Sequence, residues 1–253
     1  MKRCLTFILF LSLLTKASLA QELFKQTRIE AVAGAGISQF FGDIGGYTPS
    51  ANIIGIRDII LHQTRFNIEG ALKYRILKDL SVKVSLSGGM FHAADTRGSN
   101  EVRGMEASTF FLEPAVTGEY YFIKSRQEGK YSFFKGKQMM GSFFSFIDFY
   151  AFTGFGGLSY SVKGNSTLVN SGMKKGGFTA VIPVGIGANF LYSSDYSFGL
   201  ELGGRYTFSD YLDGYSSKYS KSNDVYYLMT FTFTYRIPTL LNGMPKFMSK
   251  RRY

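Results

Sequence analysis

The 253-residue sequence has one cysteine, five prolines and no tryptophan. A single cysteine excludes a disulfide-bonded scaffold, and the scarcity of proline leaves long stretches free to form hydrogen-bonded strands. Charged residues are also few, at 19% of the chain, whereas an average protein has about 25%. Phe, Tyr and Gly are abundant, with 25, 17 and 29 copies. This composition predicts strands and turns, and it argues against disorder.

The first twenty residues have the three parts of a secretory signal peptide. Lys2 and Arg3 precede an apolar run, Leu5–Leu14, which is too short to span a bilayer. The small residues Ser18 and Ala20 then stand third from and next to the expected cleavage point. We expect cleavage after residue 20. Cleavage lowers the formal surplus of positive charge from +11 to +8 and removes Cys4. An exported chain without cysteine is typical of the Gram-negative envelope.

The remaining sequence alternates between apolar and polar residues with a period of two, which predicts strands. In 224–236, DVYYLMTFTFTYR, aromatic and aliphatic residues alternate with threonines. No segment after the signal peptide has a run of apolar residues long enough for a membrane helix, so a membrane crossing requires a closed barrel. The predicted strands are 28–40, 64–76, 79–92, 107–123, 144–162, 177–192, 195–209 and 224–237.

A soluble sandwich also alternates, but two features favour a membrane barrel. The apolar rows are about ten residues long, as a tilted strand needs to cross the hydrocarbon layer. Aromatic residues also stand at the ends of these rows, where barrels have their interfacial girdles. We therefore predict an all-β fold, an eight-stranded antiparallel transmembrane β-barrel over 21–237, followed by a basic tail, 238–253. The girdle residues are Phe66, Tyr74, Tyr120, Phe122, Phe190, Tyr192, Tyr206, Phe208, Tyr227 and Tyr235.

The connections between the predicted strands alternate in length. Short ones (77–79 and 193–195) alternate with longer ones, which predicts short periplasmic turns, long outer loops and both termini in the periplasm. The connection 124–143 breaks this pattern, because it is long on the short-turn side. It is either a solvated loop or a docking segment for periplasmic partners. The candidate partner contacts in it and in the tail are Lys124, Arg126, Lys130, Lys135, Lys137, Lys250, Arg251 and Arg252.

Charged residues on the inner faces of the strands predict a polar network inside the barrel. Eight strands leave an interior just wide enough for side chains, and buried charges need partners. We expect a polar plug, while the alternative of a gated pathway has no specific support in the sequence. The predicted network consists of Arg65, Glu69, Lys73, Arg75, Glu113, Glu119, Glu201, Arg205 and Arg236.

The sequence offers little for catalysis or for cofactors. Its two histidines, His62 and His92, are predicted near the outer ends of strands, where a hydrolase or acyltransferase site is conceivable, but no spacing marks one. Two histidines without a mature cysteine argue against structural zinc, and no phosphate-binding glycine motif is present. The basic residues are spread over turns, lumen and tail, which argues against nucleic-acid binding. We predict no enzymatic activity and no cofactor.

Two motifs, one of them in separate parts, resemble a known family. They are Glu201–Asp213 (ELGGRYTFSDYLD), Asn223–Tyr227 followed by a last strand ending Thr234–Arg236, and Phe41–Gly46 (FGDIGG) after the first strand. They resemble small outer-membrane barrels that accompany the type IX secretion and gliding machinery, of which the PorG-like component is the type. The resemblance implies an eight-stranded barrel without catalytic residues that binds periplasmic ring or motor components.

Three functional hypotheses follow, of which the third is the outer-rim hydrolase or acyltransferase site near His62 and His92 described above. In the first, the protein is a non-enzymatic outer-membrane anchor or accessory subunit of a type IX-like secretion apparatus, with outer-membrane lipid and periplasmic secretion-machine subunits as its partners. In the second, it is a stand-alone structural or adhesion barrel that acts through the outer loops 41–63 and 210–223.

Overall fold

The computed structural model describes most of the chain between residues 28 and 238. The predicted signal peptide, most of the connection 124–143 and nearly all of the predicted tail lie outside the described residues. Within the described residues, no helix is long and apolar enough to cross a membrane. The described ranges are 28–45, 61–96, 101–124, 147–193, 195–216 and 223–238.

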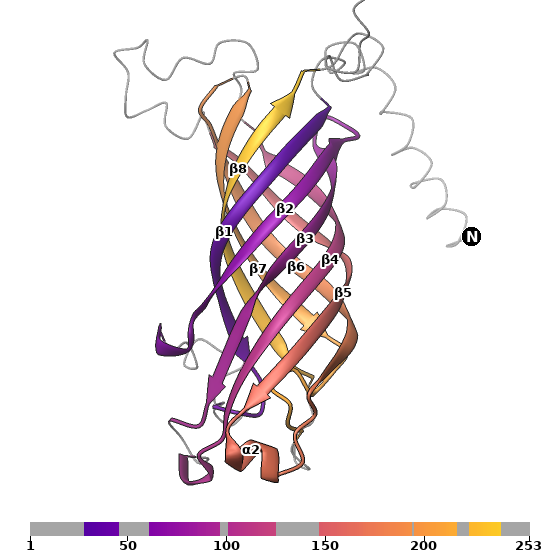
Figure 1. Ribbon diagram of the computed structural model, residues 1–253. Helices are drawn as coiled ribbons and strands as arrows, with labels where there is room; N and C mark the ends of the chain where they lie inside the picture. Colours follow the sequence, from indigo (N-terminus) through magenta and orange to yellow (C-terminus); the bar gives the residue numbers. More distant parts are fainter. Residues whose placement is uncertain are drawn as a thin grey trace, which may run out of the picture.

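Eight strands close into a single antiparallel barrel (Figure 1). Each strand pairs with its neighbours in sequence, and β1 closes the barrel by pairing with β8, from Ile29 opposite Ile237 to Phe41 opposite Val225. The predicted fold is therefore confirmed, and the predicted strand limits differ from the observed ones by a few residues. The strands are β1 (Ile29–Phe41), β2 (Arg65–Arg75), β3 (Leu80–Ala94), β4 (Glu106–Ile123), β5 (Ile147–Gly164), β6 (Gly176–Leu191), β7 (Tyr196–Thr207) and β8 (Val225–Ile237).

The two ends of the barrel differ in their connections. We call one the turn end, since the short β2–β3 and β6–β7 connections lie there with the start of β1 and the end of β8. The opposite, loop end has the connections that follow β1, β3, β5 and β7, with the short helices α2 (Ser166–Asn170), η4 (Leu61–Gln63) and η5 (Glu101–Arg103) (Figure 1). Asn165 caps α2 by accepting a hydrogen bond from the Leu168 amide at 3.0 Å.

The outer surface of the barrel is apolar. On β2, Phe66, Ile68 and Leu72 are each about 60% exposed, while Asn67 and Glu69 between them are buried in the lumen. Aromatic rings lie on the outer surface near both ends, as Tyr120 near the turn end and Phe208 near the loop end do. A soluble sandwich buries its apolar rows, whereas a membrane barrel turns them outward to lipid. The alternation therefore belongs to a membrane-spanning barrel.

Candidate functional site

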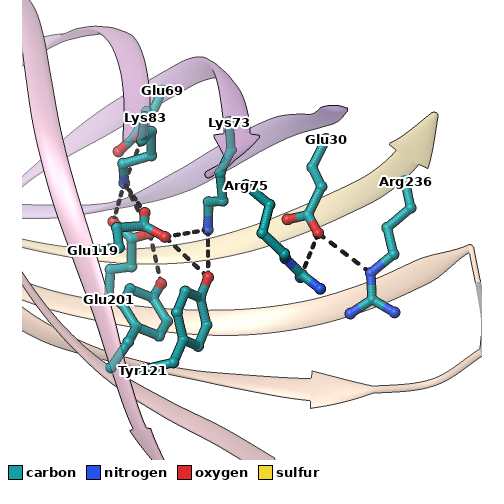
Figure 2. Close-up of polar contacts among 10 residues, drawn as sticks. Glu30, Glu69, Lys73, Arg75, Lys83, Glu119, Tyr121, Glu201 and Arg236 are labelled. Atoms are coloured by element: carbon teal, nitrogen blue, oxygen red, sulfur yellow. Dashed lines mark hydrogen bonds and ion pairs between the residues drawn. The ribbon is translucent and has the colours of Figure 1, made fainter. Parts of the chain in front are cut away.

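The lumen contains an ionic cluster nearer the turn end, centred on Lys83 (Figure 2). Its Nζ atom is 2.6 Å from Glu201 Oε2, 3.2 Å from Glu69 Oε1 and 3.8 Å from Glu119 Oε1. These carboxylates come from β7, β2 and β4, so one lysine of β3 links four strands across the interior. The Lys83 side chain is only 3% exposed, and a buried ammonium requires such partners.

Lys73 and two tyrosines extend this cluster. Lys73 Nζ is 2.7 Å from Glu119 Oε2 and donates to the Tyr121 hydroxyl, which in turn donates to Glu119. Tyr150 donates to Glu201 at 2.7 Å. The Tyr150 ring lies over Gly187, where an added Cβ would overlap it. The glycine therefore makes room for a ring that would otherwise not fit into so narrow a barrel.

A second group of ion-paired side chains, around Glu30, lies closer to the turn end. Glu30 Oε1 is 2.8 Å from Arg75 Nη2 and 3.4 Å from Arg236 Nε (Figure 2). The three residues come from β1, β2 and β8, so these ion pairs span the strand pairing that closes the barrel. Glu30 is almost fully buried, and the two guanidinium groups compensate its charge.

A third group lies between the ionic cluster and the loop end. Arg205 Nε is 3.6 Å from Glu113 Oε1, and the Tyr226 hydroxyl donates to Glu113 Oε2 at 2.6 Å. Arg205 also donates to the carbonyl of Gly203. The Tyr226 ring belongs to the apolar packing beyond this point, so the tyrosine joins the polar interior to the apolar one.

Towards the loop end, the lumen is filled by an aromatic plug, which we define as Phe40, Phe91, Phe111 and Tyr226. Phe91 and Phe111 stack with ring centroids 4.2 Å apart and an interplanar angle of 5°, and Phe91 also contacts Phe40 and Tyr226. Leu212, from the β7–β8 connection, packs against this cluster and has no exposed surface. Rings packed this tightly are a barrier to water and ions rather than a path.

Loop residues are tied over the plug by buried carboxylates. Asp213 accepts hydrogen bonds from the amides of Ile44 (3.0 Å) and Tyr215 (2.9 Å). Asp95 accepts from the Gly45 amide and from Arg103 Nε at 2.7 Å. Burial raises the pKa of Asp213 to about 7. We call this arrangement the loop-end cap, which joins the segments after β1, β3 and β7.

Together these contacts fill the interior of the barrel with paired charges and packed rings. These buried ion pairs link strands across the lumen and fill it with side chains. Each of the five inner glutamates forms an ion pair with at least one of five inner cations, and Lys83 and Glu30 each have more than one partner. The glutamates are Glu30, Glu69, Glu113, Glu119 and Glu201, and the cations are Lys73, Arg75, Lys83, Arg205 and Arg236.

Most residues of the predicted lumen network lie in these groups, but Arg65 does not. It lies at the loop end, partly exposed, and donates to the backbone carbonyls of His62 and Thr64. The other eight lie inside the barrel: Glu69, Lys73, Arg75, Glu113, Glu119, Glu201, Arg205 and Arg236.

The prediction missed two central residues, Lys83 and Glu30. Lys83 lies between Ser81 and Ser85 on the inner face of β3, so the period of two already placed it inside. Glu30 lies in β1, where apolar or small residues such as Val32 and Gly34 also occupy the inner face. The two faces of this strand therefore differ little in polarity, and the sequence pattern did not show that Glu30 points inward.

Of the predicted partner contacts, the structure describes only Lys124. It donates to the Lys78 carbonyl, lies 3.9 Å from Asp79, and therefore packs on the β2–β3 turn at the turn end. The others lie outside the described residues and remain predictions: Arg126, Lys130, Lys135, Lys137, Lys250, Arg251 and Arg252.

The described ranges contain no group of three or more His, Cys, Asp or Glu side chains able to hold a metal ion. His62 lies exposed in η4, and His92 is buried in β3 beside Ser108.

Comparison with solved structures finds other small barrels. Similar structures include Neisserial surface protein A (11% identity, 82% of this chain and 96% of that one, TM-score 0.44). They also include the attachment invasion locus protein Ail of Yersinia pestis (12%, 83% and 99%, 0.40) and the outer membrane protein OprG from Pseudomonas aeruginosa (9%, 83% and 97%, 0.39). No protein-family model and no curated protein matches the chain. The strand pairing and the apolar outer surface are those of an outer-membrane β-barrel.

Proposed function

We propose that this protein is a non-conducting outer-membrane anchor that serves as an accessory subunit of a type IX-like secretion apparatus. The filled lumen is the observation that supports this most directly. Compensated ion pairs occupy the interior, and the aromatic plug closes it towards the loop end. A barrel without a passage acts through its ends and its outer surface.

The turn end is the better candidate for partner binding. Two of its connections are tight turns, whereas the β4–β5 connection, 124–146, is long and begins with the basic Lys124. Basic side chains on such a segment favour association with an acidic protein surface. In the proposed orientation the turn end faces the periplasm, where secretion subunits would be reached, as the resemblance to PorG-like barrels implies.

The test reverses the charge of the turn-end segment by changing Arg126, Lys130, Lys135 and Lys137 to Glu. We expect the variant barrel to insert normally but to lose secretion subunits in a pull-down from detergent-solubilised outer membrane, with reduced secretion. The matched control changes Lys174 and Lys175, which are exposed at the loop end, to Glu and should leave both readouts intact. Unchanged co-purification and secretion in the turn-end variant would overturn the proposal.

A second candidate function, surface binding through the loop end, is favoured by the loop-end cap. Asp213, Asp95 and Arg103 fix backbone segments from three connections, and a fixed surface loses little entropy when it binds. The test replaces 46–60 with a short Gly-Ser linker. Lost cell-surface binding with normal secretion would favour this function over secretion.

A further inference from the structure

Three side chains on the outside of the barrel form a linked polar row at the loop end of β3 and β4. His92 Nδ1 is 3.1 Å from Ser108 Oγ, and His92 Nε2 is 3.6 Å from Glu106 Oε1. His92 and Ser108 are direct partners across the two strands. Glu106 and Ser108, two residues apart in β4, point to the same side.

This row lies on the outer, lipid-facing side of the wall. The residues that alternate with it, Phe91, Ala107 and Thr109, are buried inside the barrel. The next outward residue of β4 is Phe110, which is 56% exposed. The row therefore stands at the loop-end edge of the apolar outer surface, where a lipid headgroup meets its acyl chains.

A cation stands beside the hydroxyl. Lys163 of β5 is the direct strand partner of Ser108, and it is exposed, whereas its neighbour Val162 is buried in the interior. The wall thus has a largely buried imidazole, a partly exposed hydroxyl and an exposed ammonium on three adjacent strands. An ammonium at this place can bind a phosphate of an anionic lipid.

A hydroxyl, an imidazole and a carboxylate in this order are the components of a serine nucleophile. With its proton on Nε2, His92 faces Glu106 at a distance of 3.6 Å and offers the Nδ1 lone pair to the Ser108 hydroxyl. Ser108 is partly exposed, so a substrate carbonyl can reach it from the lipid side. The sequence offered no such spacing, because the pairing of His92 with Ser108 depends on the register of two strands.

We propose that Ser108, His92 and Glu106 form a lipid esterase site on the outer wall, with an acyl ester of an anionic membrane lipid as the substrate. Ser108 is the nucleophile, His92 the general base, Glu106 a positioning residue, and Lys163 binds the lipid phosphate. This activity is independent of the proposed anchoring function, which uses the turn end. An experiment can therefore disprove either the esterase activity or the anchoring function without affecting the other.

The reaction proceeds in two balanced steps. Ser108 Oγ transfers its proton to His92 Nδ1 and attacks the ester carbonyl carbon; the carbon–oxygen bond to the lipid alcohol then breaks, and the alcohol leaves with the proton from His92. In the second step a water molecule, deprotonated by His92, attacks the acyl-Ser108 ester. The fatty acid is released, and the proton returns to Ser108.

The first experiment measures the nucleophile directly in the purified full-length barrel, with folding checked by heat-modifiable gel migration. We expect a fluorophosphonate probe to label Ser108 and phosphatidylglycerol vesicles to release free fatty acid. Ser108→Ala should lose both signals, whereas Ser161→Ala, an exposed serine on neighbouring β5, should keep both. The proposal is overturned if the folded wild-type protein is not labelled, or if it releases no more fatty acid than Ser108→Ala. The contact between His92 and Ser108 would then be only a structural hydrogen bond between strands.

Further variants separate the roles. His92→Gln should slow hydrolysis by roughly 10²-fold or more, the usual contribution of a general base, while His62→Gln should not. Glu106→Gln should lower kcat and leave KM unchanged. Lys163→Gln should raise KM for phosphatidylglycerol vesicles but not for a neutral p-nitrophenyl ester. If His92→Gln hydrolyses the ester as fast as the wild type, the assigned mechanism is wrong.

Discussion

The two halves of the lumen are filled by opposite means. Near the turn end, Lys83 and its carboxylates are held by charge at distances down to 2.6 Å. Near the loop end, Phe91 and Phe111 are held by stacking and exclusion of water. Both halves are buried and both link distant strands, yet each depends on a different property of its side chains.

The difference shows how a narrow barrel can fix its strands from inside. Each charge in the ionic cluster needs its partner, because an unpaired ion in a water-poor interior is costly. The aromatic plug has no charged side chain that could lose its partner. Its stability therefore depends on how completely its rings fill the interior. Tyr226 belongs to both halves, since its ring packs on Phe91 while its hydroxyl binds Glu113.

Removing the central cation should have the largest effect. Lys83→Met leaves Glu69 and Glu201 without their shared partner, and we expect a loss of about 4 kcal/mol in the free energy of unfolding. Urea titration of the barrel in detergent micelles measures it. Adding Glu201→Gln to Lys83→Met should recover part of the loss. A loss below about 1 kcal/mol would show that the ionic half is not held by pairing.

Emptying the plug should cost somewhat less. Phe111→Ala removes a fully buried ring that stacks on Phe91, and we expect a loss of about 3 kcal/mol from the resulting cavity. The same titration applies, with Phe111→Leu as the conservative control that should cost clearly less. Equal losses for both variants would mean that filled volume does not decide stability here.

The residue shared by both halves allows their contributions to be separated. Tyr226→Phe keeps the ring but removes the hydroxyl that donates to Glu113 at 2.6 Å, so a loss of about 2 kcal/mol is expected for the unsatisfied carboxylate. Tyr160→Phe is the control, since its hydroxyl lies 3.2 Å from the hydroxyl of the partly exposed Ser209 rather than from a buried carboxylate. An equal effect of the two changes would contradict the role of Glu113.

The smallest effect is expected at the loop-end cap, as a dependence on pH. Burial raises the pKa of Asp213 from 3.8 to about 7, so the folded cap binds the proton more tightly than the unfolded chain does. Cap stability is therefore greatest at low pH and falls as the pH rises towards and through 7. Hydrogen-exchange protection of the Ile44 and Tyr215 amides measures it.

In this experiment Asp213→Asn should reduce the pH dependence, and adding Asp224→Asn, whose pKa burial also raises, should remove most of the remainder. Asp79→Asn, at an exposed carboxylate of the turn end, should leave it unchanged. Protection that increases with pH in the wild-type protein would contradict the assignment to Asp213.

Much of the fold could be predicted because alternation is a local property. Thr230, Thr232 and Thr234 lie inside and Phe231 and Phe233 outside, as their positions in the sequence require. The same rule placed Glu69, Glu119 and Glu201 in the lumen. It was weakest in β1, where small residues occupy both faces and Glu30 went unnoticed.

The sequence alone determined which side chains face inward, which face lipid, and that eight strands must close to satisfy their backbone groups, because these follow from the period of a strand and the absence of water in the bilayer. Tertiary structure decided which inward charges meet. Lys83 and Glu201 are separated by 118 residues, and His92 and Ser108 meet only through the β3–β4 register. Such contacts depend on strand stagger across the whole barrel, which no local pattern encodes.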